Sequence, residues 1–524
     1  MNRHGSYLVA TGIFLSRIAG LVRQRVLSHY LGISGTSDIW NAAFRIPNFL
    51  QNLLGEGALS ASFIPAYARL LGEERHEEAR RLASAVLGLL MTVVAVVVLV
   101  GVAVAPWMVA VIEPGFSDAQ RTLTTMIVRI LFPATGLLVI SAWCLGVLNS
   151  HRQFLLSYAA PVAWNFAIIV TILLFASDRS PEGFIVIAAI GAVVGGVLQV
   201  AVQWPSVRGV AGPILPGLWR GVHGVPTVMR AFVPNVISRG ANQISAFVDL
   251  ALASLIWGAT TAIASAQILY TLPVSLFGIA ISAAELPEMA RERGDDATIA
   301  SALRIRLDAS TQRLAYYIVP SAMGFLALGG VIAAALFQTG EFTEANSRYV
   351  WLVLAGSSIG LLAATLGRLY SSTFYALHDT RTPLRAGLVR VAVGASLGLF
   401  AALVLPGALG LPVHWGAAGI TAASGIAAWV EFLLLRRSLA ARIGHFDLPT
   451  TELMKLWVAA LAAAATSTAA RLLLPEMPPI FLAAITVPVN ALTYLGVTSW
   501  WDIPEAAVIT SRIGRVLKRL GGRR

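Results

Sequence analysis

Apolar residues in this chain come in long runs separated by short polar segments. Each run holds about 18 residues or more with few charges, enough for a helix to cross roughly 30 Å of hydrocarbon. Such runs are predicted to be helices, because lipid offers no partner to an open backbone group. The pattern predicts about fourteen membrane-spanning helices. Their approximate ranges are 7–29, 36–67, 83–112, 122–149, 156–177, 182–204, 227–257, 260–289, 312–337, 347–375, 384–405, 411–435, 453–474 and 479–501.

Composition agrees with this class. Of 524 residues, 57% are hydrophobic and only 12% are charged, and the mean hydropathy is +0.75. A soluble protein carries roughly twice that charged fraction. The sequence therefore predicts an all-α polytopic membrane protein. Its single cysteine, Cys144, cannot form an intrachain disulfide. Arg17, Arg23 and Arg25 interrupt the first apolar run, so we expect no cleavable signal peptide there.

The cations alternate between the loops. The net charge is +12, from 38 Lys and Arg against 26 Asp and Glu. One set of alternate loops, with both termini, holds 24 cations, whereas the other set holds only Arg121, Arg179 and Arg348. Because cytoplasmic loops carry the excess of Lys and Arg, both termini are predicted to be cytoplasmic. Fourteen spans satisfy the even number that this requires. The positive charge is explained by these anchors, and no nucleic-acid partner is expected.

Three short matches indicate a parallel internal repeat. All three keep the same membrane side and are offset by about 220–230 residues. Duplicated halves of this kind are common in transporters. The matched pairs are Phe63–Arg69 with Glu285–Arg291, both ending in Pro-x-x-Ala-Arg, Pro114–Asp118 with Thr339–Glu344, and His151–Arg152 with His378–Arg381.

The repeat sets the expected organisation of the chain. Two pseudo-symmetric six-helix lobes are followed by two appended helices. We predict an N-lobe over residues 1–225, a C-lobe over 226–450, helices thirteen and fourteen over 451–502, and a basic cytoplasmic tail over 503–524.

The second span carries charges where apolar residues are expected. Each charge at mid-bilayer costs about 2.5–3.5 kcal/mol, so it needs an explanation. Asp38, Arg45, Asn52 and Glu56 are spaced 7, 7 and 4 apart, which puts them within about 40° on one helical face. Asn41 and Asn48 flank this stripe, and Pro47 is predicted to bend the helix.

Spans one, seven and eight carry further polar residues. Arg17 and Arg23 of span one are about 120° apart and share only a broad face. Span seven carries Arg239 between amides, with Asp249 near its far end. The remaining polar positions on spans seven and eight are Asn235, Asn242, Gln267, Thr271, Ser275 and Ser282, the last four around Pro273.

These four spans are the first two of each repeat, and we interpret them as the lining of a water-filled cleft between the lobes. The lining holds four arginines, Arg17, Arg23, Arg45 and Arg239, against three acids, Asp38, Glu56 and Asp249. This cationic excess favours an anion, and the planar guanidinium fork suits phosphate. The alternative is that Asp38–Arg45 and Glu56–Arg23 are structural ion pairs that fix helix register.

Several segments resemble the MurJ/MviN family of lipid II flippases. The N-terminal block is the most specific, and the matches run in order through the first twelve predicted helices. The matching segments are Ser16–Arg23, Thr36–Asp38, Phe44–Asn48, Gly55–Ser60, Phe63–Pro65, Gln243–Ser245, Leu272–Gly278, Leu336–Thr343 and Phe374–Pro383.

This resemblance implies a member of the multidrug/oligosaccharidyl-lipid/polysaccharide exporter superfamily. Such a protein flips lipid II, an undecaprenyl-pyrophosphate-linked precursor of peptidoglycan, between leaflets of the bacterial inner membrane by alternating access. A cationic cleft takes the pyrophosphate, and a groove near spans thirteen and fourteen takes the lipid tail. The resemblance carries the family's arginines onto Arg17 and Arg23, and its acids onto Asp38 and Glu56.

The chain departs from the family pattern at two places. A basic residue of span two falls at Gln51, and the arginine of span eight falls near Ile268. Arg239 on the adjacent span seven is the candidate that supplies the missing cation.

Other function classes remain as alternatives. An exporter of another polyprenyl-linked polysaccharide precursor, or a multidrug exporter of the same superfamily, is the second choice. A membrane enzyme is disfavoured, because Asp295-Asp296 is read as a solvated turn and no cluster suggests a metal or general base. No nucleotide motif is present, so no cofactor is expected. Membrane potential or a cation gradient, with Asp249 as a candidate ion ligand, is the expected drive. Expected partners are lipid II, the bilayer and the cell-wall synthesis machinery.

Overall fold

The computed structural model describes residues 3–176, 179–219, 221, 222, 224–292, 295–444 and 449–521. The side chains of residues 3–10, 56, 57, 61, 234, 235, 237–245, 296, 512–514 and 516–521 lie outside this description. Within the described ranges the chain is helical, apart from one isolated antiparallel bridge between Thr339 and Phe342. The all-α class is therefore confirmed.

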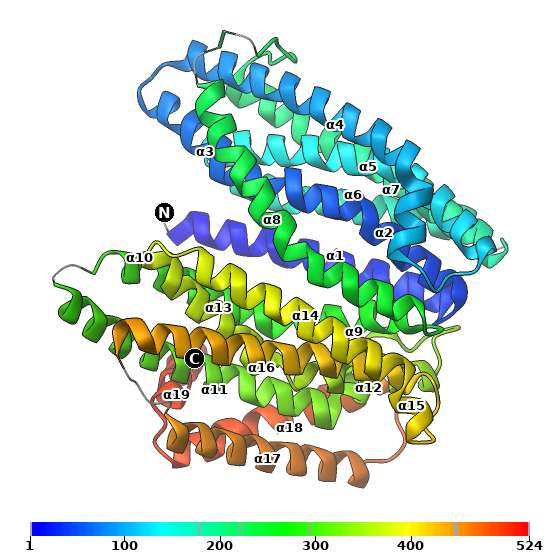
Figure 1. The fold of residues 1–524 in the computed structure, drawn as a ribbon, viewed down its shortest axis with the longest axis vertical. Coiled ribbons are helices and arrows are strands. Elements are labelled where there is room, and N and C mark those ends of the chain that lie inside the picture. Colours follow the sequence, from blue (N-terminus) through cyan, green and yellow to red (C-terminus); the bar gives the residue numbers. More distant parts are fainter. Residues whose placement is uncertain are drawn as a thin grey trace. The chain divides into compact units, whose positions relative to one another are not determined.

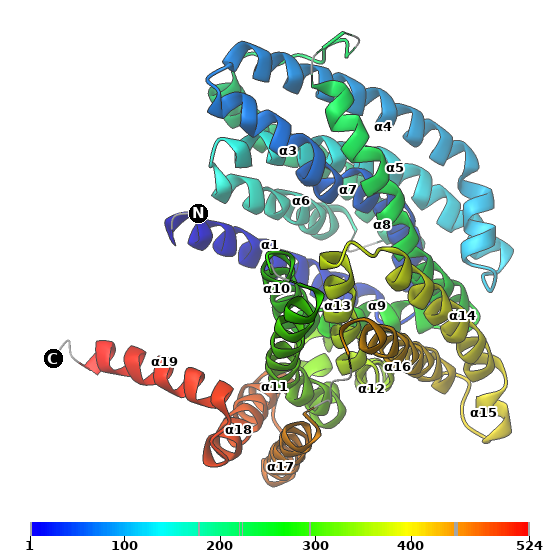
Figure 2. The same ribbon diagram turned by 60° about the vertical axis from the view of Figure 1, so that its left-hand side comes forward.

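The chain divides into two compact units, which are drawn in Figures 1 and 2. Unit 1 comprises Met1–Thr261 with Thr339–Phe342, and unit 2 comprises Ala262–Gln338 with Thr343–Arg524. The helices of unit 1 are α1 (Arg3–Leu31), α2 (Gly35–Leu54), α3 (Glu56–Gly72), α4 (His76–Ile112), α5 (Asp118–Ser150), α6 (Phe154–Phe175), α7 (Pro181–Ala211) and α8 (Val225–Ser254).

Unit 2 begins within α9 and runs to the end of the chain. Its helices are α9 (Ala259–Pro273), the π-helix η1 (Val274–Ile279), α10 (Ala280–Ala290), α11 (Asp296–Phe337), α12 (Glu344–Ser358), α13 (Leu361–Ala376), α14 (Arg381–Leu403), α15 (Leu405–Ala408), α16 (Trp415–Ile443), α17 (Thr450–Leu473), α18 (Pro479–Trp500) and α19 (Pro504–Gly521).

Every predicted span lies on one helix or on consecutive helices. Among the described residues, ten spans are long and apolar enough to cross a membrane, and the pair α12–α13, bent by 44°, makes an eleventh if it counts as one. The other three predicted spans correspond to α1, to α2 with α3, and to α8.

The two units pack their helices in the same internal order. In unit 1, α7 contacts α6 and α5, and α5 also packs on α2, α3 and α4. In unit 2, α16 contacts α14, α12 and α13, and α12 also packs on α11. The matched helices are those that the sequence repeat pairs. The helix α8, which opens the second repeat, packs on α2, α3 and α4 of unit 1.

The matched loops share their backbone geometry as well. Ser117 caps α5 by accepting from the Gln120 N–H, and Thr343 caps α12 by accepting from the Asn346 N–H. After α5 and α13 the chain turns through Arg152 at φ +62° and His378 at φ +57°. Positive φ is uncommon outside glycine, so its recurrence at matched positions supports the repeat.

Two differences from the predicted organisation follow from packing. The predicted lobes divide at residues 225 and 226, whereas the units divide at Thr261, because α8 packs within unit 1. The lobes derive from the repeat and stay a prediction. The tail predicted over 503–524 contains the helix α19.

Span two is interrupted at Gly55, and the bend expected at Pro47 stays a prediction. The helix α2 continues through Pro47 and ends at Leu54. A Cβ on Gly55 would lie 2.3 Å from the Gln51 carbonyl oxygen, so a side chain does not fit this backbone. Glu56 therefore starts a new helix. The helical angle between Asp38 and Glu56 was calculated for one continuous helix, so it does not apply.

The helix type changes in span eight directly after Pro273. Proline lacks the N–H that an α-helix uses, and the next six residues form the π-helix η1. Within unit 2, the ring of Phe277 in η1 stacks on Tyr317 of α11 with centroids 4.3 Å apart. Gln267 before η1 is exposed, whereas Ser282 after it is buried, so the predicted polar stripe does not keep one face.

Candidate functional site

Asp38 joins the first turn of α2 to the segment that follows α8. Its side chain is 3% exposed. Oδ2 accepts a hydrogen bond from the Gly258 N–H at 2.7 Å, and Oδ1 accepts from the N–H and Oγ1 of Thr261 at 2.8 and 2.7 Å. These donors lie at the start of α9, where a helix favours a negative charge. Asp38 therefore caps α9.

Neighbouring polar side chains extend this contact. Ser34 and Ser37 form a capping box at the start of α2. The Thr261 hydroxyl also lies 2.9 Å from Ser37 Oγ, and Asn41 donates from Nδ2 to Thr261 Oγ1 at 3.2 Å. The bonds hold α2 and residues 258–261 together inside unit 1.

Arg45 interacts with acids other than the one predicted from sequence. Its guanidinium is attracted by Asp249 of α8 and by Glu113, the residue after α4. Among the described residues, no ion pair within 4 Å joins Arg45 to Asp38, whose oxygens are taken by the capping donors. The Asp38–Arg45 register pair is thus not formed.

Arg23 of α1 is held by aromatic rings. Its guanidinium carbon lies 5.1 Å from the ring centroids of both Phe44 of α2 and Trp164 of α6. This cation–π geometry stabilises a cation without neutralising it. Its Nε is buried and has no hydrogen-bond partner among the described residues.

The same rings border a small cavity inside unit 1. Asn48 and Pro47 line it beside Phe44 and Trp164. Arg17 of α1 and Asn52 of α2 are exposed, and Gln51 is half-buried. Unit 1 therefore contains Arg17, Arg23, Arg45, Asp38, Asn48, Gln51, Asn52 and Asp249 from the predicted set.

Part of the predicted set lies outside the described side chains. These residues are Glu56, Arg239 and Asn242, and the Glu56–Arg23 pair with them. Gln267 belongs to unit 2, where its Nε2 donates to Thr271 Oγ1 at 3.1 Å. The cleft between the lobes and the roles of these residues stay predictions.

Unit 2 pairs the charges inside its helices. Arg390 of α14 donates from Nη1 to Glu431 Oε2 of α16 at 2.9 Å. The side chains are 33% and 14% exposed. Arg368 of α13 is exposed and, like Arg390, lies close enough to Tyr270 to interact with it electrostatically.

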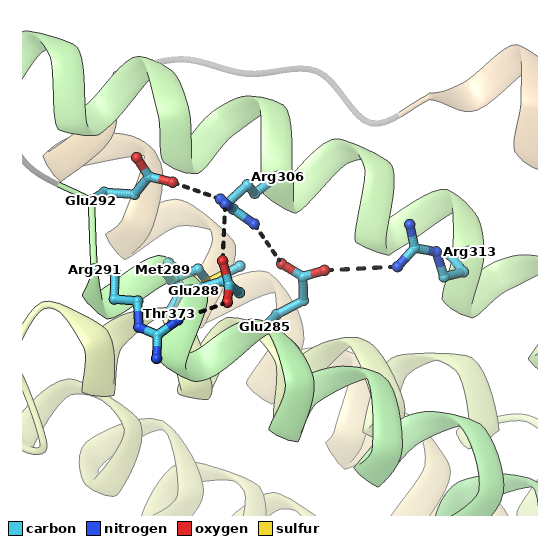
Figure 3. Close-up of polar contacts among 8 residues, drawn as sticks. All are labelled: Glu285, Glu288, Met289, Arg291, Glu292, Arg306, Arg313 and Thr373. Atoms are coloured by element: carbon cyan, nitrogen blue, oxygen red, sulfur yellow. Dashed lines mark hydrogen bonds and ion pairs between the residues drawn. The ribbon is translucent and has the colours of Figure 1, made fainter. Parts of the chain in front are cut away.

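A charged cluster ties α10 to α11 within unit 2 (Figure 3). Arg306 lies 2.7 Å from Glu292, 3.5 Å from Glu288 and 3.5 Å from Glu285. Arg313 approaches the other oxygen of Glu285 at 3.8 Å. These ion pairs give a structural role to the acids in and next to the matched segment Glu285–Arg291. Reasoning from the spacing of residues did not reveal the ion pairs.

Glu113 is the residue of unit 1 that sequence reasoning missed. It follows directly after the apolar run over 83–112. In the structure it is 0% exposed. Its only sequence signal is an acid placed directly between that run and Pro114-Gly115. Among the described residues, no group of three or more His, Cys, Asp or Glu could hold a metal ion.

Comparison with known proteins decides the family. The family model described as "Lipid II flippase MurJ" matches residues 27–487. This chain belongs to that family. A probable lipid II flippase MurJ of Rhizobium meliloti (strain 1021) is 32% identical over 464 residues, covering 86% of this chain and 83% of the relative. The lipid II flippase MurJ of Burkholderia cenocepacia is 31% identical over 452 residues, covering 84% of each chain.

Solved structures agree on the fold. A lipid II flippase MurJ in an inward closed conformation matches with a TM-score of 0.75 at 20% identity, over 94% of this chain and 98% of the other. An inward-facing multidrug resistance transporter of the MATE family matches with a TM-score of 0.63 at 16% identity, over 81% and 95%. The family consists of transporters rather than enzymes, and this chain is a multi-pass protein of the bacterial inner membrane.

Proposed function

We propose that this chain moves lipid II from the inner to the outer leaflet of the cytoplasmic membrane by alternating access. Family membership supports the substrate, because the curated relatives at 31–32% identity are lipid II flippases or probable ones. Both termini lie in the cytoplasm in this proposal, as the distribution of loop cations favours.

The observation that carries the proposal is the state of Arg23. A guanidinium inside a helical bundle normally sits beside a carboxylate, because an unpaired buried charge is costly. Arg23 instead lies beside the stacked rings of Phe44 and Trp164, and among the described side chains no carboxylate pairs with it and its buried Nε has no partner. Such a cation keeps its charge and donors for an incoming anion, and a pyrophosphate offers several acceptor oxygens.

The remaining arginines would extend this site. Arg17 on α1 is exposed, and the positive charge of Arg45 interacts electrostatically with Asp249 and Glu113. We propose that Arg17, Arg23, Arg45 and Arg239 bind the pyrophosphate. Gln267 and the amides of α2 and α8 would contact the headgroup. Glu56 and Asp38 would balance the cations between substrates.

The drive of the cycle needs no cofactor in this proposal. A charge that crosses the membrane field exchanges about 2.3 kcal/mol per 100 mV, so membrane potential or a cation gradient is sufficient to bias the cycle. Asp249, electrostatically coupled to Arg45, is the proposed point of ion coupling. The cell-wall synthesis machinery that consumes the flipped lipid is the proposed partner.

The test is rescue of a flippase-depleted bacterium, scored by lipid II exposed on the outer leaflet. Arg23→Ala should reduce exposure roughly thirtyfold, because a hydrogen bond to a charged group contributes about 2 kcal/mol. Arg23→Lys should rescue in part, since lysine keeps the charge but not the planar fork. The matched control is Arg69→Ala, which removes an exposed cation whose Nε lies 3.8 Å from Glu73.

A second arm tests the compensation by Arg239. Arg239→Ala should lose activity as Arg23→Ala does, because no arginine stands at Ile268 of span eight. If Arg239→Ala rescues fully while Arg23→Ala loses activity at equal membrane abundance, the compensation by Arg239 is contradicted. The proposed substrate site is not contradicted by that result. Wild-type exposure in Arg23→Ala contradicts the proposed substrate site.

A further inference from the structure

Glu113 places a carboxyl group in the interior of unit 1 without a hydrogen-bond partner among the described residues. It follows α4, and its N–H donates to the Val109 carbonyl at 2.8 Å, so the backbone continues the last helical turn. The side chain is 0% exposed, and neither Oε1 nor Oε2 has a hydrogen-bond partner among the described residues. An ionised carboxylate in such a place is strongly disfavoured.

The neighbouring charges do not neutralise Glu113. Within the part of the chain that the structure describes, the charged groups that act on it are Asp38 and Arg45, both on α2. Arg45 is also attracted by Asp249 of α8, so one cation serves several acids. Asp38 is occupied by the donors of Gly258 and Thr261.

The cation on the next helix is directed elsewhere. Arg121 of α5 donates from Nη2 to the Pro114 carbonyl at 2.7 Å and lies 3.9 Å from Asp118. It therefore binds the backbone of the loop and an exposed acid rather than the Glu113 carboxyl group.

The loop that carries Glu113 is fixed against α8. The Gly115 N–H donates to Ser254 Oγ at 3.0 Å. A Cβ on Gly115 would lie 2.2 Å from the Ser254 carbonyl oxygen, so the two backbones touch directly. Glu113 consequently cannot reach solvent while the loop stays on α8.

We propose that Glu113 is a proton-binding site, occupied while residues 113–116 lie on α8 and emptied to water when that contact opens. The chemistry favours a proton over a metal ion. Sodium or calcium needs several oxygen ligands, whereas the Asp38 oxygens here already accept from Gly258 and Thr261.

Electrostatics support this assignment. Glu113 lies in the loop beyond the end of α4, and burial raises the pKa of its carboxyl group to about 9, with Asp38 adding to the rise and Arg45 opposing it. The group is then protonated at neutral pH in the folded protein. Ionising it leaves a negative charge near Asp38, which weakens the closed loop.

The sign of the pH effect follows from linkage. An unfolded glutamate titrates near 4.5, so between that pH and about 9 the folded protein binds one more proton than the unfolded chain. The folded protein should therefore lose stability as pH rises through this window. Glutamine at this position cannot titrate and should remove the loss.

The experiment measures the thermal unfolding midpoint of the purified full chain in nanodiscs from pH 5 to pH 9. The wild-type midpoint should fall steadily across this range, while Glu113→Gln matches it at pH 5 and falls less. Asp118→Asn, an exposed acid of the same loop, is the matched control and should follow the wild type. Identical pH profiles for wild type and Glu113→Gln overturn the proposal.

Two further measurements keep the test decisive. Glu113→Met, neutral and similar in length, should show the same flattened profile if the glutamine variant does not fold. Infrared spectra of the wild type at pH 7 should contain a protonated carboxyl band that both variants lack. The absence of that difference also overturns the proposal. The coupling of this proton to transport rests on the proposed function, but these measurements need no transport, so either idea can fail alone.

Discussion

Unit 1 and unit 2 have the same internal helix order and handle buried charge differently. In unit 2, Arg390 and Glu431 form a direct ion pair at 2.9 Å, and Arg306 lies among three glutamates. In unit 1, Asp38 is held by backbone donors and Arg23 by aromatic rings, while the Glu113 carboxyl group has no hydrogen-bond partner among the described residues. Charges that are already neutralised stabilise a fold, whereas charges held by other means stay available to a ligand. The comparison favours structural roles for the pairs of unit 2 and supports the binding roles proposed for the residues of unit 1.

The largest effect on stability is expected at Asp38. Asp38→Ala removes an acceptor of three hydrogen bonds and leaves the Gly258 and Thr261 donors buried, which should cost about 3 kcal/mol. Asp38→Asn keeps an acceptor and should cost about half as much. Thermal unfolding in nanodiscs measures both. Equal losses in the two variants would show that the oxygen acceptor is unimportant.

A smaller effect is expected at the ion pair of unit 2. Glu431→Ala leaves Arg390 without its partner, and because that arginine is 33% exposed we expect a loss of about 2 kcal/mol, below the range for fully buried pairs. The double variant Arg390→Leu with Glu431→Leu should recover most of it. Rescue of the depleted strain by this double variant would support a structural role, and loss of rescue with intact stability would assign unit 2 a site of its own.

The smallest effect concerns the loop of Glu113. Gly115→Ala forces a Cβ against the Ser254 carbonyl oxygen and should cost about 1.5 kcal/mol. The matched control is Gly72→Ala in α3, where a Cβ meets no atom within 4 Å and alanine favours the helix. A Gly115→Ala protein as stable as the control would show that the loop can leave α8 freely.

The sequence was sufficient for the spans because hydrophobic length is a local property. All fourteen predicted ranges coincide with helices, and the repeat predicted from Pro114–Asp118 and Thr339–Glu344 coincides with matched caps at Ser117 and Thr343. The break at Gly55 was missed because the helical angles of the polar residues were calculated for one unbroken helix. A proline draws attention in sequence, whereas a glycine break depends on the backbone that forms around it.

The partners of the charged residues could not be read from spacing. Asp38 and Arg45 are seven residues apart on one helix, which suggested a pair. The partners found lie far away in sequence, at Gly258 and Thr261 for Asp38, and at Asp249 and Glu113 for Arg45. Such partners are selected by tertiary packing. The aromatic rings beside Arg23 likewise come from two other helices, α2 and α6.

The π-helix of span eight has a consequence for where this span can lose a residue. A π-turn accommodates a residue more than an α-turn, so η1 contains spacing that the α-helices on either side do not have. Deleting a single residue between Val274 and Ile279 would convert the stretch to α-helix and leave α10, with its glutamates, near its present orientation about the helix axis, because the π-turn already contains the extra residue. The same deletion inside α9 or α10 would instead rotate the charged helix end by roughly 100°, so η1 is the part of this span that can lose a residue without that rotation.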